Sequence, residues 1–103
     1  MFRVSKELVE VRVFSIEGGQ KLAGTIHDLG GFKVKFVFGD FSDLILLLIS
    51  HLEEAKKYGS ELQSEILSHY IDYYRTGEFS HFEQSQIKWV KDEDPKVESN
   101  FGF

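Results

Sequence analysis

The chain has 103 residues, 42% of them hydrophobic and ten of them phenylalanine, a composition that excludes a disordered protein and predicts one domain with its own core. It contains no cysteine, which excludes disulfides, thiolate metal sites and cysteine nucleophiles. The formal net charge is −5, divided into +2 for residues 1–39 and −7 for residues 40–103, so direct nucleic-acid binding is disfavoured and a basic protein partner is favoured.

The first forty residues have the apolar alternation of β-strands. One alternating segment runs from Val9 to Val13, a second passes through residues 22–26, and the clearest covers Phe32–Phe38, where lysines occupy the opposite face. Glycine pairs at residues 18–19 and 30–31 lie between these segments and supply the positive φ of tight turns. These patterns predict an antiparallel meander of three strands.

After Gly39 the apolar period changes from 2 to 3.6, which predicts a helix. Asp40 or Ser42 is expected to cap its N-terminus, and Gly59 is expected to end it. The run at residues 44–49 is entirely apolar, so one covering layer cannot bury every side chain in it. The expected buried stripe contains Leu44, Ile45, Leu48, Ile49, Leu52 and Ala55, whereas Leu46 points away from it.

A second helix is predicted to begin at the capping box of residues 60–63 and to end at Gly77. The short link between the two helices predicts an antiparallel helical hairpin. Ile87 and Trp89 alternate with polar residues, which predicts a fourth strand through residues 84–91.

Together these elements predict an α+β fold in the order β-β-β-α-α-β. We expect an antiparallel sheet of three to four strands, with the helical hairpin packed on its phenylalanine-lined face. Residues 1–91 are predicted to form the single domain. Residues 92–103, which open with an acidic run and contain the only proline, are predicted to form a flexible acidic C-terminal tail.

Motifs that carry chemistry are missing from the sequence. The four histidines (His27, His51, His69 and His81) show neither i,i+4 spacing nor an H-E-x-x-H motif, and no G-x-S-x-G motif surrounds a serine. The glycine pairs lie between strands rather than before a helix, where a phosphate would bind. We therefore predict no metal, no cofactor, no catalytic residue and no enzymatic activity.

The leading functional interpretation is a small acidic protein-binding domain that occupies a partner's surface. One version is an inhibitor or immunity-type protein that blocks a basic toxin such as a nuclease, since carboxylates complement a cationic cleft. The residues expected to bind this partner are Glu61, Glu65, Asp72, Glu78, Glu83, Asp92, Glu93, Asp94 and Leu46.

Two alternatives remain open. A homodimer through the helical layer, centred on Leu46, would have a structural or regulatory role. A small enzyme or ligand-binding domain would instead need an apolar pocket with convergent polar groups such as His27, His51 or Tyr73. Because no secretory signal and no membrane-spanning run is present, we expect a cytoplasmic protein without membrane contact.

Overall fold

The computed structural model describes residues 2–4, 7–17 and 25–101. It contains four strands, β1 (Phe2–Val4), β2 (Leu8–Phe14), β3 (Ile26–Asp28) and β4 (Lys33–Asp40), followed by three helices, α1 (Ser42–Ala55), α2 (Glu61–Thr76) and α3 (Phe79–Trp89). The predicted α+β class is confirmed. Among the described residues, none of the helices combines the length and the apolar character needed to cross a bilayer.

The sheet is mixed rather than antiparallel. Its strand order is β1-β2-β4-β3, in which β2 and β4 run parallel while β1 and β3 form antiparallel edges. The predicted alternation at Val9–Val13 and Phe32–Phe38 therefore identified neighbouring strands, but their relative direction was wrong. The predicted turn at residues 18–19 and most of the predicted second strand lie outside the described residues.

The predicted fourth strand at residues 84–91 is wrong, because this segment belongs to α3 and the turn that follows it. Phe82, Ser85 and Trp89 recur at helical spacing, and Ser85 is fully buried. Ile87, which suggested the strand, is exposed. An alternation over only four residues is compatible with either structure, so packing against α2 decides it.

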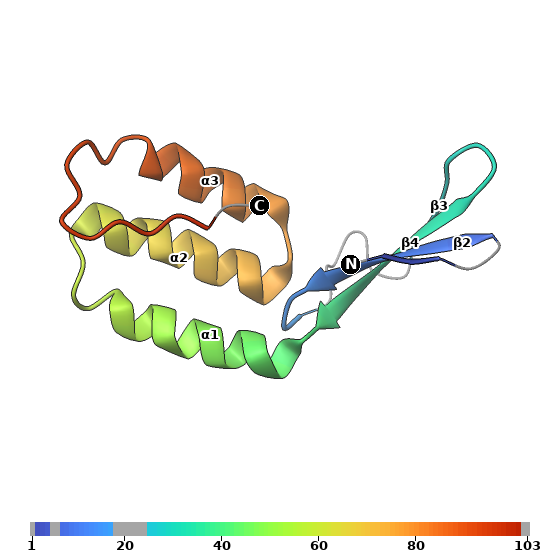
Figure 1. Ribbon diagram of the computed structural model, residues 1–103, viewed down its shortest axis with the longest axis horizontal. Coiled ribbons are helices and arrows are strands. Elements are labelled where there is room, and N and C mark those ends of the chain that lie inside the picture. The colour runs from blue at the N-terminus through green and yellow to red at the C-terminus, as the bar shows by residue number, and fades with distance from the viewer. Residues whose placement is uncertain (1, 5–6, 18–24, 102–103) are drawn as a thin grey trace.

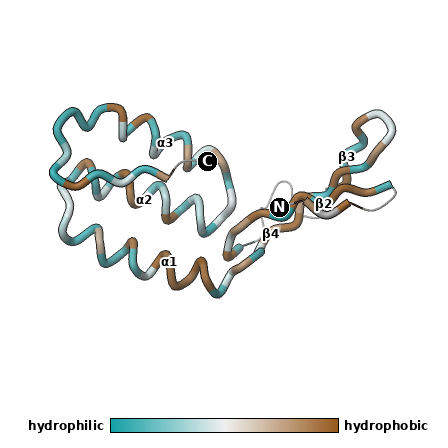
Figure 2. Tube along the Cα trace, viewed as in Figure 1, coloured by the Kyte–Doolittle hydropathy of each residue, from teal (hydrophilic) through white to brown (hydrophobic). Residues whose placement is uncertain are grey.

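The helical hairpin is present, but it does not cover the sheet. Figure 1 shows the helices and the sheet end to end, and the molecule measures 50 × 27 × 20 Å. Only Phe41 separates β4 from α1, so α1 continues away from the sheet and has no turn in which to fold back over it. The prediction that α1 packs on the phenylalanine-lined face is therefore wrong. Many apolar residues of β2, β4 and the first half of α1 consequently lie outside a common core (Figure 2).

The main core lies between the helices. It consists of buried side chains from α1 and α2 (Ile45, Ile49, Leu52, Ile66, Leu67, Tyr70 and Ile71), with Phe82, Trp89 and Phe101 packed against them. Leu44, expected in the buried stripe, is 64% exposed. Burial of the core side chains stabilises the helical layer by about 25 cal/mol for each Å² of apolar surface removed from water.

The helix ends show which capping predictions hold. Ser60 caps α2 through its hydroxyl, which accepts a hydrogen bond from the Gln63 N–H at 3.1 Å. Gly77 ends α2 in the left-handed conformation (φ 73°). Asp40 and Ser42 do not cap α1, because the N-cap is Phe41 and Asp40 instead pairs with Arg12 at 2.8 Å.

The joint between the sheet and the helices forms where β2 and β4 meet the end of α2. The Arg75 carbonyl accepts hydrogen bonds from the backbone N–H groups of Ile16 (3.1 Å) and Glu17 (2.8 Å). The buried Ser15 hydroxyl donates to the Glu17 carbonyl and accepts from the Gly39 N–H, both at 2.9 Å. These bonds satisfy a helix-end carbonyl and fix how the two layers meet.

The segment after α3 lies along the helices in its described part, residues 92–101 (Figure 1). The Phe101 ring packs edge-on against Tyr70, with the ring centroids 4.7 Å apart. The boundary at residue 91 and the flexibility of residues 92–103 stay predictions.

Gly77→Ala should destabilise the protein more than a glycine substitution at a similar but open position. An added Cβ would lie 2.8 Å from Val13 Cγ1 and 2.9 Å from Phe38 Cδ1. We expect a loss of about 1–2 kcal/mol from the left-handed backbone and about 1–3 kcal/mol more from overpacking, measured by urea unfolding. Gly30→Ala is the control, because Gly30 is also left-handed (φ +65°) but a Cβ added there would meet nothing within 4 Å. Equal losses in the two variants would contradict this account of the joint.

Asp40→Asn should change the acid dependence of stability. The hydrogen bond from Arg12 lowers the pKa of Asp40 from its ordinary value of 3.8. The pair therefore stabilises the fold above about pH 3.8, and this contribution is lost as pH falls through the lowered pKa.

Consequently, the difference in free energy of unfolding between wild type and Asp40→Asn should shrink on acidification in a denaturant series. Asp43→Asn is the control, since it removes an exposed carboxylate in the first turn of α1 that makes no ion pair with a described residue. The role of the ion pair would be refuted if the difference in free energy of unfolding between wild type and Asp40→Asn stayed constant down to about pH 2. That pH is well below the ordinary pKa of an aspartate.

Candidate functional site

The carboxylates predicted to bind a partner do not form one patch. Glu61, Asp92, Glu93 and Asp94 lie near the start of α2, whereas Asp72 and Glu78 lie near its other end (Figure 1). Glu65 is engaged internally, because Lys88 on α3 donates to its carboxylate at 2.6 Å and thereby lowers its pKa. Glu83 is exposed on α3, and Leu46 is 51% exposed on α1. Their role in binding stays a prediction.

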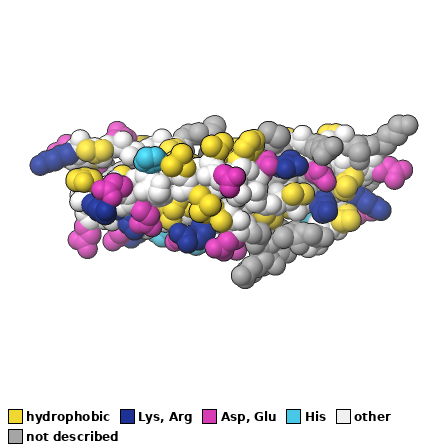
Figure 3. All heavy atoms as spheres, turned by 90° about the horizontal axis from the view of Figure 1, so that it is seen from below, with side chains coloured by type: hydrophobic (Ala, Val, Ile, Leu, Met, Phe, Trp, Pro, Cys, Tyr) yellow, Lys and Arg dark blue, Asp and Glu magenta, His cyan; other side chains and the backbone are white. Residues whose placement is uncertain are grey.

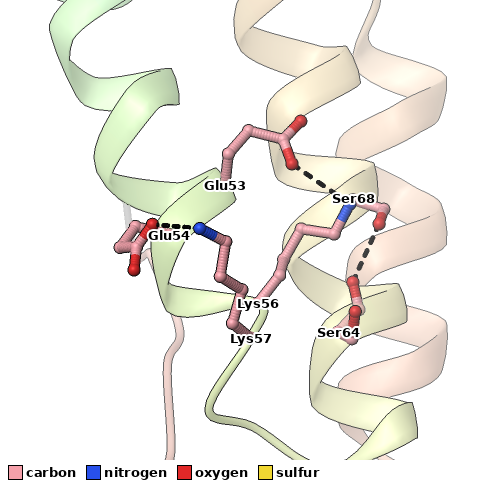
Figure 4. A network of polar contacts seen from close by, with 6 residues as sticks. All are labelled: Glu53, Glu54, Lys56, Lys57, Ser64 and Ser68. Atoms are coloured by element: carbon pink, nitrogen blue, oxygen red, sulfur yellow. Dashed lines mark hydrogen bonds and ion pairs between the residues drawn. The ribbon is translucent and has the colours of Figure 1, made fainter.

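Further charges are paired locally at the C-terminal end of α1. Glu53 pairs with Lys56 and Glu54 pairs with Lys57, each at i,i+3 spacing (Figure 4). On the neighbouring α2, the Ser68 hydroxyl donates to the Ser64 carbonyl at 2.8 Å. Exposed pairs of this kind contribute about 0–1 kcal/mol, so this surface is a solvated helix edge rather than a reactive site.

A cavity of about 400 Å³ lies between the α1–α2 link and the segment after α3. It is lined by Tyr58, Gly59, Ser60, Gln63, Asp92, Asp94, Pro95, Lys96 and Val97. The Gln63 side chain is 4% exposed, and its Nε2 has no hydrogen-bond partner among the described residues. The lining thus combines the buried Gln63 with the charged residues Asp92, Asp94 and Lys96.

A polar network crosses the helical core beside this segment. The buried Tyr70 hydroxyl donates to Asn100 Oδ1 (3.0 Å) and accepts from Gln86 Nε2 (2.9 Å) and the Phe101 N–H (3.2 Å). Gln86 Nε2 also donates to Asn100 Oδ1 at 3.1 Å. The network therefore ties α2, α3 and residues 100–101 together. Sequence reasoning missed it, because uncharged side chains far apart in the chain leave no spacing pattern.

The side chains proposed for a ligand pocket are not brought together. His27 lies on β3 with its ring 5.8 Å from that of Phe36, His51 is exposed on α1, and Tyr73 is half-buried on α2. Burial raises the pKa of the Tyr73 hydroxyl. By contrast, α2 and α3 bring His69, Asp72 and His81 close enough to share a metal ion, although the sequence predicted no metal.

The described residues thus hold a cavity with a mixed polar and apolar lining, a buried tyrosine network and a histidine–carboxylate cluster. The chain belongs to Peptidase family M49, whose family model matches residues 1–103.

Its curated relatives are named dipeptidyl peptidase 3. The chain is 33% identical over 78 residues to the protein from Dictyostelium discoideum and 30% identical over 78 residues to those from Rattus norvegicus and Nematostella vectensis. Each match covers 75% of this chain and 11% of the relative. The chain thus spans about a tenth of the length of the curated relatives that it matches.

Membership of a peptidase family overturns two conclusions drawn from the sequence and favours one of the alternatives. The inhibitor or immunity-type interpretation is wrong, the expectation of a protein without enzymatic activity is wrong, and the alternative of an enzyme or ligand-binding domain fits better. The error arose because an acidic surface and missing short motifs were read as evidence about function, although acidic surfaces most often serve solubility.

Tyr70→Phe should loosen the attachment of residues 100–101 to the helices. Removal of the hydroxyl takes a partner from three groups, and we expect a loss of about 1–3 kcal/mol in the free energy of unfolding. Hydrogen exchange at the Phe101 amide should also become faster.

Tyr58→Phe is the matched control, because Tyr58 is 80% exposed and its hydroxyl contacts only Glu54 Oε1 at 3.2 Å among the described residues. Its stability should change by less than about 0.5 kcal/mol. Similar losses in both variants would show that the buried network has no special contribution.

Proposed function

We propose that this chain is one segment of a longer peptidase that releases dipeptides from peptides. The observation that carries the proposal is the family match over residues 1–103, together with relatives named dipeptidyl peptidase 3. Amide hydrolysis needs an activated nucleophile, and in the described part of the chain no serine hydroxyl is hydrogen-bonded to a histidine. We therefore assign this segment a supporting role, with the hydrolytic chemistry completed by other parts of the peptidase.

Exposed apolar surface supports placement within a larger body. On α1, Leu44, Leu46 and Leu47 are 64%, 51% and 58% exposed. Figure 3, which views the molecule from the side of α1 in Figure 1, shows hydrophobic side chains among the charged ones on this face. Phe2, Val4, Phe14, Ile26 and Phe32 of the sheet region are exposed as well. Burial of each large side chain is worth about 1.5–3 kcal/mol, which favours a covering surface.

The role of Leu46 in binding and the cytoplasmic location remain proposals. Leu46 is proposed to contact the rest of the peptidase, although a second copy of the chain or a basic protein could occupy the same surface. The cytoplasmic location also remains a proposal, supported by the absence of cysteine from the composition.

The test is activity of the longer gene product that contains this chain. The wild-type protein should release dipeptides from the N-termini of peptides, whereas Leu46→Glu should lower both the melting temperature and the yield of active protein, because it places a charge against an apolar contact. Gln84→Glu is the control, since it adds the same charge on an exposed position of α3.

A wild-type product without dipeptide release would refute the proposed function. If Leu46→Glu behaves like Gln84→Glu, the α1 face is not covered by the rest of the peptidase. Sedimentation of both variants then shows whether Leu46 supports association of two copies.

A further inference from the structure

Two helices bring together two imidazoles and a carboxylate. His69 and Asp72 lie one turn apart on α2, so they share a face of that helix, and His81 lies in the first turns of α3, which packs against α2. One ligand atom from each of the three residues lies within 4.8 Å of the others. No pairwise spacing in the sequence reveals this cluster, because the three residues meet only after α3 packs on α2.

The donor set matches what zinc-class divalent metals prefer. Imidazole nitrogen and carboxylate oxygen bind Zn²⁺ at about 2.0–2.2 Å, which places neighbouring ligand atoms in a tetrahedral site about 3.3 Å apart. The present separations are wider by up to about 1.5 Å. Asp72 is exposed and can rotate about its side-chain bonds, so its carboxylate can adjust toward an ion held by the two imidazoles.

The surroundings favour a cation. His69 Nδ1 is buried and has no hydrogen-bond partner among the described residues, a state that buried polar atoms rarely keep. Glu78 Oε2 lies 4.0 Å from His81 Nε2. One carboxylate therefore stands beside the cluster in addition to Asp72.

We propose that His69, Asp72 and His81 bind a divalent transition metal of the zinc class and that the metal clamps α2 to α3. Three protein ligands leave a fourth position, which water or Glu78 can occupy. The bound ion would hold α2 and α3 together more firmly than their hydrogen bonds and apolar packing do alone. This site goes beyond the proposed peptidase function and does not depend on it.

The experiment titrates the full-length, metal-stripped protein with Co²⁺, a spectroscopic substitute for Zn²⁺, and follows the visible absorption and the number of bound equivalents. Wild type should bind one equivalent more than His81→Ala and one more than Asp72→Asn at micromolar Co²⁺. His51→Ala, which removes an exposed histidine on α1 outside the cluster, should match wild type.

Stability provides a second readout. Added Zn²⁺ should raise the unfolding midpoint of wild type and His51→Ala, because a ligand that binds only the folded state stabilises it, and should raise it less in the two cluster variants. Asp72→Asn keeps the fold intact, since Asp72 is exposed, so loss of structure cannot explain its result. Equal Co²⁺ stoichiometry and equal Zn²⁺ stabilisation in all four proteins would overturn the proposal.

Discussion

The carbonyl of Arg75, which accepts hydrogen bonds from the backbone N–H groups of Ile16 and Glu17 just after β2, determines how the sheet and the helices are arranged. It closes the C-terminal end of α2 and attaches the sheet there, while Gly77 lets the chain pass within contact distance of Val13 and Phe38. A side chain at residue 77 would hold the two layers apart. The sheet and the helices are therefore joined at their ends, and neither covers the other's face.

This end-to-end joint explains the exposed apolar surface on α1 and the sheet. A domain of 103 residues would ordinarily bury such faces against each other, and the single residue between β4 and α1 prevents that. Exposed apolar surface of this kind is expected in a segment that other parts of a larger protein cover, and this chain matches about a tenth of the dipeptidyl peptidase 3 relative from Dictyostelium discoideum. Within such a protein, the helices, tied together by the Tyr70 network, offer a surface against which other segments can pack.

Sequence patterns were reliable where structure depends on neighbours along the chain. The cap at Ser60, the left-handed glycine at 77 and the hairpin of α1 and α2 follow from local hydrogen bonding and helical periodicity. The same reasoning failed at residues 84–91, where four alternating residues fit two periods and the contact with α2 selects the helix. It also failed for strand direction, because the alternation of side chains is the same in parallel and antiparallel sheets.

The candidate sites were the least predictable part. The roles of these residues depend on which side chains are buried and on which helices are neighbours. This holds for Gln63, for Tyr70 and for the grouping of His69 with Asp72 and His81. Uncharged or widely spaced residues give no periodic signal that would reveal burial or neighbouring helices. The α+β class, the strand or helix character of most segments and the ends of α2 could be predicted from the order of residues, since they arise from short-range sterics and hydrogen bonds. Strand direction, the third helix, the uncovered faces and the clustered side chains emerged only in the folded molecule, because each depends on contacts between residues distant in the chain.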